Sequence, residues 1–167
     1  MKTIYLVRHA KSSWNDPSLK DIDRPLRKRG VKDAGKMADF LLSERVHPDL
    51  IISSHATRAL STARIFARAL HYHAGRIRID ERIYDDLEDS FGEILRQVNE
   101  KFEDLMIFGH DPSMTSLLNR LASKRYEKIP TSGVARIDFR VREWAAVTKG
   151  RGKLGYLRFP KNTGRNP

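Results

Sequence analysis

Three short apolar runs along the chain are each followed by polar residues that carry chemistry. The runs consist mainly of β-branched, aromatic and other large apolar residues, which is typical of strands buried on both faces of a sheet. They lie at 3–7, 50–52 and 105–108. Because ligands of open α/β sheets bind at the carboxyl ends of such strands, we expect the residues after each run to face a crevice.

Amphipathic helices are predicted between these strands. Apolar residues recur at helical spacing over 27–46, 56–70, 91–102 and 113–121. Ile77 and Ile79 mark a further short strand, and the polar segment that ends at Pro25 is predicted to be a loop. This alternation favours an α/β fold, a three-layer α/β/α sandwich with a mostly parallel central sheet.

The end of the chain follows a different pattern. Apolar and charged residues alternate from 135 to 142, as in a half-buried strand near a sheet edge. The apolar segments 144–147 and 154–159 flank Lys149-Gly150-Arg151-Gly152, which predicts a hairpin turn. No internal repeat or low-complexity linker divides the sequence, so residues 1–167 are expected to form a single domain.

Composition excludes several classes of protein. The chain is 40% hydrophobic and 32% charged, which is typical of a soluble globular protein. It has no cysteine, so disulfides, thiolate metal sites and a cysteine nucleophile are excluded. No apolar stretch approaches the roughly 18 residues of a membrane span. Because Met1 leads almost directly into the first strand, we expect no signal peptide, no membrane partner and a cytoplasmic location.

The net charge of +11 raises the question of nucleic-acid binding. Six of the cations, among them Lys161 and Arg165, lie in the last nineteen residues, which contain no acidic residue. A solvated terminal segment accounts for that excess, and a phosphate-binding site also gains from a positive field. We therefore do not expect nucleic acid to be the specific partner.

Two arginines and two histidines follow the buried strands. Arg8 and His9 come after the first strand, Arg58 after the second and His110 after the third. A neutral imidazole is a competent nucleophile toward phosphorus, and guanidinium groups bind phosphate oxygens bidentately. These residues therefore predict a site for a phosphoryl group. The histidines interpreted as structural are His47, His55, His71 and His73.

The same residues lie in motifs that resemble those of the histidine phosphatase superfamily, which includes phosphoglycerate mutases and acid phosphatases. The matching stretches are Arg8-His9-Ala10, Ser53-Ser54-x-x-x-Arg58-Ala59-x-x-Thr62-Ala63 and Gly109-His110-x-Pro112. The short length and Arg24-Pro25-Leu26-x-x-Arg29-Gly30 are similar to the small phosphohistidine phosphatases of the SixA type. The resemblance extends from Lys2 to about Phe139.

The resemblance implies a phosphatase that forms a phosphohistidine intermediate on its own nucleophile, His9. It also implies that Arg8, Arg58 and His110 complete the phosphate pocket. The positions that match substrate contacts of the mutases are Ser12 and Asn15.

The proton-donating glutamate of the mutases has no clear match in this chain. Asp85 is the first candidate for the acid, followed by Asp86 and Glu81, and a solvated acidic loop is the alternative. Phosphohistidine depends little on such an acid, because its imidazole leaves more readily than an alkoxide. The insertions that cover the mutase pocket are also absent, which implies an open pocket suited to a phosphoryl group on a protein surface.

No metal or cofactor is expected. The acidic cluster around Asp85 lacks histidine partners and defined ligand spacing, and the chain has no P-loop, dinucleotide or zinc pattern. The expected substrate is phosphohistidine on a protein, or a small phosphoester. The alternatives are a non-catalytic phosphate- or nucleic-acid-binding module on the same fold, and a phosphoglycerate mutase-type enzyme. The sequence indicates neither the phosphorylated partner nor the oligomeric state.

Overall fold

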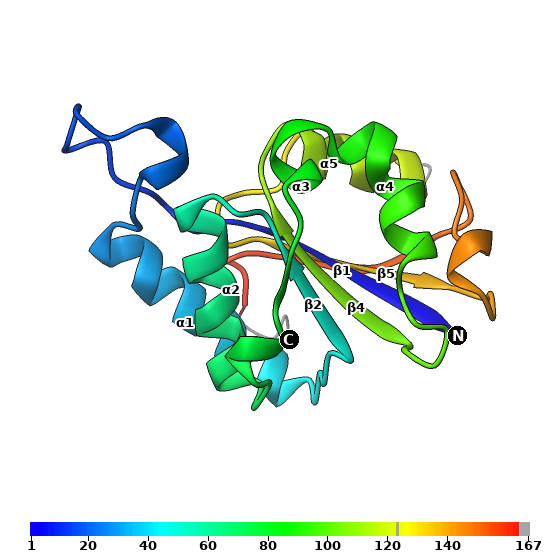
Figure 1. Ribbon diagram of the computed structural model, residues 1–167. Coiled ribbons are helices and arrows are strands. Elements are labelled where there is room, and N and C mark those ends of the chain that lie inside the picture. Colours follow the sequence, from blue (N-terminus) through cyan, green and yellow to red (C-terminus); the bar gives the residue numbers. More distant parts are fainter. Residues whose placement is uncertain (123, 164–167) are drawn as a thin grey trace.

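The computed structural model describes residues 1–122 and 124–163 (Figure 1); Arg165 of the basic terminal segment lies outside them. A six-stranded sheet forms its centre. The strands are β1 (Lys2–Arg8), β2 (Leu50–Ser53), β3 (Arg78–Ile79), β4 (Asp104–Gly109), β5 (Val134–Phe139) and β6 (Lys153–Arg158). Their order in the sheet is β3-β2-β4-β1-β5-β6. The first four of these run parallel, β5 is antiparallel to β1, and β6 is antiparallel to β5.

Helices cover both faces of the sheet (Figure 1). On one face lie α1 (Lys28–Ser43) and α2 (Thr57–Ala69), and on the other lie α4 (Leu87–Arg96) and α5 (Ser113–Ala122). The short helix α3 (Arg82–Asp85) directly precedes α4. The predicted three-layer sandwich with a mostly parallel sheet is therefore confirmed. Within the described ranges, no helix is at once long and apolar enough to cross a membrane.

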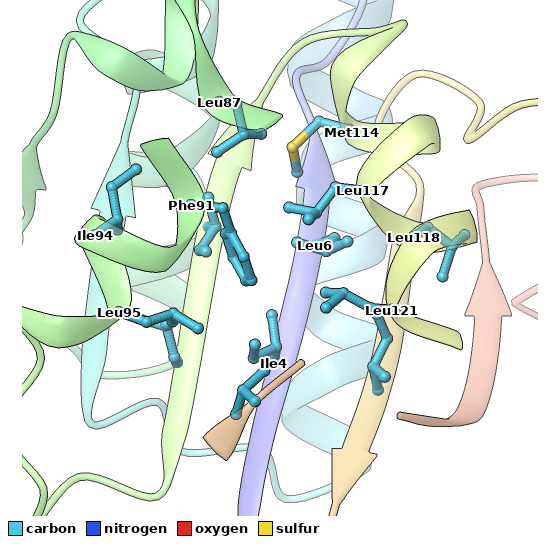
Figure 2. Packing of buried hydrophobic residues seen from close by; sticks show 14 of the residues in the cluster. Ile4, Leu6, Leu87, Phe91, Ile94, Leu95, Met114, Leu117, Leu118 and Leu121 are labelled. Atoms are coloured by element: carbon cyan, nitrogen blue, oxygen red, sulfur yellow. The ribbon is translucent and has the colours of Figure 1, made fainter. Parts of the chain in front are cut away.

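The apolar run in β1 supplies side chains to both layers. Ile4 and Leu6 pack against α4 and α5, as Figure 2 shows, whereas Tyr5 and Val7 belong to the cluster beneath α1 and α2. Successive side chains of a strand point to opposite faces, so a continuous apolar run is what a doubly covered strand requires. Burying each such side chain contributes about 1.5–3 kcal/mol.

The helix predicted at 91–102 begins and ends earlier than expected. Helix α4 includes Leu87, which shares the apolar face of Phe91, and its first turn carries acids that favour a helix start. Beyond the helix, the Asn99 side chain accepts a hydrogen bond from the Lys101 backbone N–H at 2.9 Å. This turn diverts the chain, so Phe102 lies in a connection to β4 rather than in a helix.

The hairpin predicted across 144–159 is also wrong in its first half. Trp144–Ala146 forms a 3-10 turn instead of a strand. The Trp144 ring is fully buried, and its indole N–H donates to the Phe102 carbonyl at 3.2 Å. Burial of this large ring against the helical layer takes the segment out of the sheet, and β6 pairs with β5 directly.

The start of α1 touches the loop that follows β1. A Cβ atom at Gly30 would overlap the backbone carbonyl oxygen of Lys11. In the same region the Arg27 N–H donates to that Lys11 carbonyl at 2.9 Å. Glycine therefore permits a close backbone approach that fixes the loop carrying the residues after His9.

Replacing Gly30 by alanine is expected to lower the free energy of unfolding by about 1–3 kcal/mol, since the backbone of Lys11 must move away. Gly35 in the same helix is the matched control, because no atom lies within 4 Å of an added Cβ there. Gly35→Ala should raise stability by about 0.5–1 kcal/mol through helix propensity. Urea denaturation of the two variants measures both, and equal effects would contradict the close approach.

Candidate active site

Three neighbouring strands of the sheet end at the same edge. Arg8 at the end of β1 lies opposite Gly109 at the end of β4, and Ser53 at the end of β2 lies opposite Phe108. The residues that follow therefore converge, and the ring centroids of His9 and His110 are 5.2 Å apart. The register of the parallel strands thus brings together the two histidines predicted for the site.

Backbone contacts hold His9 in one orientation. Its Nδ1 lies 2.7 Å from the carbonyl oxygen of Ala10, which can only accept a hydrogen bond. The proton of a neutral ring must therefore be on Nδ1, which leaves the lone pair on Nε2 free. The His9 N–H donates to the Gly109 carbonyl at 3.0 Å. The imidazole is thus prepared to act as a nucleophile through Nε2.

His110 is oriented by a serine from the second motif. Its Nε2 lies 2.9 Å from the Ser54 hydroxyl oxygen, which itself accepts a hydrogen bond from the Ala56 N–H. When the hydroxyl donates to His110 Nε2, the ring proton is on Nδ1. That Nδ1 is buried and has no hydrogen-bond partner among the described residues. In that tautomer, His110 has a free N–H donor for an acceptor such as a phosphoryl oxygen.

The two predicted arginines are anchored by different partners. Arg8 Nη1 donates to the Ile129 carbonyl at 2.8 Å and lies 3.3 Å from the Asp111 carboxylate, whereas its buried Nε has no partner among the described residues. Arg58, in the first turn of α2, donates through Nη1 to the Asp21 carbonyl at 2.6 Å and through Nη2 to the Asp21 carboxylate at 2.9 Å. Each guanidinium is held in a fixed plane, which suits recognition of an oxyanion.

Arg8, His9 and Arg58 border a cleft of about 350 Å³ whose described lining contains no acidic residue. The lining residues are Arg8, His9, Lys11, Ser12, Trp14, Arg24, Arg27, Arg58 and Thr131. With five cations around one small volume, the cleft favours binding of an anion.

Thr62 joins the first two motifs to each other. Its fully buried hydroxyl accepts a hydrogen bond from the Ala10 N–H at 3.0 Å and donates to the Arg58 carbonyl at 2.7 Å. The loop that follows His9 and the helix that carries Arg58 are therefore held in register.

The remaining predicted residues are placed unequally. Ser12 lines the cleft, where its hydroxyl accepts a hydrogen bond from Arg24. Asn15 lies beyond Trp14 on an exposed part of the loop, outside the cleft lining. The three candidates for the proton donor are all exposed and lie at or beside the ends of α3: Glu81, Asp85 and Asp86.

Asp21 and Tyr84 contact the predicted site residues but were not predicted from the sequence. Asp21 binds Arg58, and Tyr84, the neighbour of Asp85 in α3, donates its hydroxyl to Asp21 at 2.8 Å. The Tyr84 ring also packs edge-on against His110, with centroids 5.3 Å apart. The sequence feature that could have led to Asp21 is Arg24, the first residue of the SixA-like motif. Arg24 donates to the Asp21 carboxylate at 2.9 Å.

Comparison with known proteins gives the family. The model of the histidine phosphatase superfamily (branch 1) matches residues 4–122, which is most of the chain. The chain belongs to the histidine phosphatase superfamily. A protein of Mycobacterium tuberculosis with no described activity is 32% identical over 168 residues, covering 93% of this chain and all of that protein.

Solved structures place the chain among SixA-like members of this superfamily. A protein of Agrobacterium tumefaciens, described as a candidate phosphohistidine phosphatase SixA, is 26% identical with a TM-score of 0.77, over 94% of this chain and 97% of that one. The protein histidine phosphatase SixA bound to tungstate has a TM-score of 0.82 over 97% and 99% of the two chains. At 18% identity, that second likeness concerns the fold.

Burial keeps both site histidines of this histidine phosphatase uncharged. It lowers the pKa of His9 to about 4, and the positive charges of Arg58 and Arg8 act in the same direction. Burial likewise lowers the pKa of His110 to about 3, and the neighbouring His9 ring adds to the effect. An uncharged His9 retains the lone pair that nucleophilic attack requires.

No group of three or more His, Asp or Glu side chains within 1–122 and 124–163 has an arrangement that could hold a metal ion. The described acidic side chains around Asp85 form no such group.

The lowered pKa values can be measured by NMR. The ring signals of His9 should remain those of a neutral imidazole from about pH 8 to about pH 5, and should shift only as the pH approaches 4. The His9→Gln variant identifies the signals. A titration midpoint near the ordinary value of 6.5 would show that burial does not control the charge of this ring.

Proposed function

We propose that this chain hydrolyses phosphohistidine on a protein through a phosphoryl intermediate on His9, with no metal ion. The observation that carries the proposal is the His9 imidazole, neutral at pH 7 and committed through Nδ1 to the Ala10 carbonyl. A binding module would need positive charge, but it would not need a fixed and uncharged imidazole among arginines. Residues 1–167 are proposed to act as one domain, since both helical layers pack on the same sheet.

The first step is attack by His9 Nε2 on phosphorus. The new P–N bond forms as the bond to the leaving imidazole of the substrate breaks, and that imidazole takes up a proton. Arg8 and Arg58 bind the non-bridging oxygens, whose charge is redistributed in the transition state. Asp85, with Asp86 and Glu81 as alternatives, is proposed to deliver the proton, directly or through water.

The second step is attack by water on the phosphorus of phospho-His9. The P–Nε2 bond breaks, one proton of the water passes to the carboxylate that acted as the acid in the first step, inorganic phosphate is released and the neutral imidazole returns. The Nδ1–H of His110 is proposed to donate to a phosphoryl oxygen in both steps, since this buried donor lacks a partner among the described residues.

The substrate class is supported by the shape of the cleft and by the likeness to SixA. The cleft opens beside the exposed residues Lys11, Trp14 and Arg27, so a phosphoryl group carried on a protein surface can reach His9. The description of the Agrobacterium relative as a candidate phosphohistidine phosphatase supports the same class.

Replacing the nucleophile tests the intermediate. The His9→Gln variant should keep its fold but lose at least about a thousandfold in turnover, because no covalent intermediate can form. Brief incubation of the native protein with substrate should trap an acid-labile, base-stable phosphate on His9. His73→Gln, at an exposed position, is the control and should remain active. Full activity in His9→Gln would overturn the mechanism.

A comparison of substrates tests the class. At equal enzyme concentration and in excess EDTA, a histidine-phosphorylated protein and an aryl phosphate should be hydrolysed faster than 3-phosphoglycerate, because the first two have better leaving groups. Isomerisation or rapid hydrolysis of 3-phosphoglycerate, with phosphohistidine untouched, would favour a mutase-type enzyme. Binding of phosphate without turnover of any substrate would favour a binding module.

A further inference from the structure

The carboxylate of Asp21 lies among the cations that border the cleft. It comes from a 3-10 turn, Asp21–Asp23, in the long loop between β1 and α1. Arg58 Nη2 donates to Oδ2 at 2.9 Å, Arg24 Nη1 donates to Oδ1 at 2.9 Å, and the Tyr84 hydroxyl donates to Oδ2 at 2.8 Å. Two distant segments, which carry Arg58 and Tyr84, and the neighbouring Arg24 thus converge on one acidic side chain.

Asp21 occupies Arg58 in the manner of an oxyanion. Its backbone carbonyl accepts a hydrogen bond from Arg58 Nη1, and its carboxylate accepts one from Arg58 Nη2. Two N–H groups of the guanidinium are therefore occupied. A phosphate binds a guanidinium through the same kind of paired contact. A bound phosphate and the Asp21 carboxylate would therefore compete for the same N–H donors of Arg58.

The burial of the partners explains why an internal anion is present. The side chains of Arg58 and Arg24 are only 8% and 9% exposed, whereas that of Asp21 is 45% exposed. Two nearly buried guanidinium groups without a counter-charge would be costly. The partly solvated carboxylate of Asp21 can supply that negative charge in the free protein. When an anionic ligand enters, it can release N–H donors of the two arginines to that ligand.

The charge of Asp21 is permanent at neutral pH. Burial opposes ionisation, but the hydrogen bonds from Tyr84, Arg24 and Arg58 outweigh it and lower the pKa of Asp21 to about 2. Asp21 is therefore no proton donor, and it keeps its negative charge beside Arg58 and Arg24 at neutral pH.

We propose that Asp21 is an internal anion that competes with phosphate for Arg58 and Arg24, and so weakens the binding of the product and speeds its release. The proposal concerns regulation of the proposed phosphate site, but not the identity of its substrate. It assigns Asp21 as a positioning residue that acts through the two arginines.

The test is the binding of inorganic phosphate, measured by calorimetry without any substrate. Asp21→Asn should lower the phosphate Kd by about tenfold, because one negative charge near the bound anion is removed. Asp21→Ala should act in the same direction, which separates loss of charge from the new amide. Asp23→Asn is the matched control, since Asp23 is an exposed acid of the same turn, and should change Kd by less than about twofold.

Unchanged or weaker phosphate binding in folded Asp21→Asn and Asp21→Ala proteins would overturn the proposal and leave Asp21 a residue that only orients Arg58. Equal effects of Asp21→Asn and Asp23→Asn would also overturn it, because the change would then reflect net charge alone. With an aryl phosphate, the Asp21 variants should show a lower Ki for phosphate and a lower KM without a rise in kcat. Because binding needs no turnover, failure of phosphohistidine hydrolysis would contradict the proposed substrate and leave this result intact.

Discussion

The parallel pairing of β1 with β4 is the constraint on which the rest of the site depends. The register sets Arg8 opposite Gly109, and the His9 N–H continues the ladder to the Gly109 carbonyl. Beyond that point the segments that follow β1 and β4 separate, and each places one imidazole at the edge of the sheet. A slip of one residue would turn these side chains toward opposite faces. The apolar residues of β1, buried in both layers, prevent such a slip.

The second requirement is electrical balance at the strand ends. Guanidinium groups bind an oxyanion more strongly when they are shielded from water. Shielded cations, however, destabilise the free protein unless a carboxylate lies near them. Here Asp111 lies beside Arg8, and Asp21 lies beside Arg58 and Arg24. The arginines are thus preorganised without a ligand, while the histidines between them remain neutral.

The fold was predictable because hydrophobic periodicity reports burial directly. Continuous apolar runs marked the doubly covered strands, and helical spacing marked α1, α2 and α5. The periodicity gave the wrong element where side-chain contacts override it. Helix α4 begins at Leu87, earlier than the pattern predicted, and the segment that starts with the buried Trp144 forms a 3-10 turn where a strand was predicted. Arg8, His9, Arg58 and His110 could be assembled because each follows a strand or opens a helix. Asp21 and Tyr84 could not, because a polar loop has no period and their contact joins residues 63 positions apart.

The stacking of Trp14 on Arg24 has a practical consequence. The Arg24 guanidinium carbon lies 3.2 Å from the centroid of the Trp14 ring, and both residues line the cleft. The chain has one other tryptophan, Trp144, whose ring is sealed in the core. Trp14 is 73% exposed, and the excited state of its indole senses a nearby cation and the water around it. The protein therefore carries its own optical probe at the entrance to the cleft, and intrinsic fluorescence can follow the approach of a ligand to Arg24 without any label.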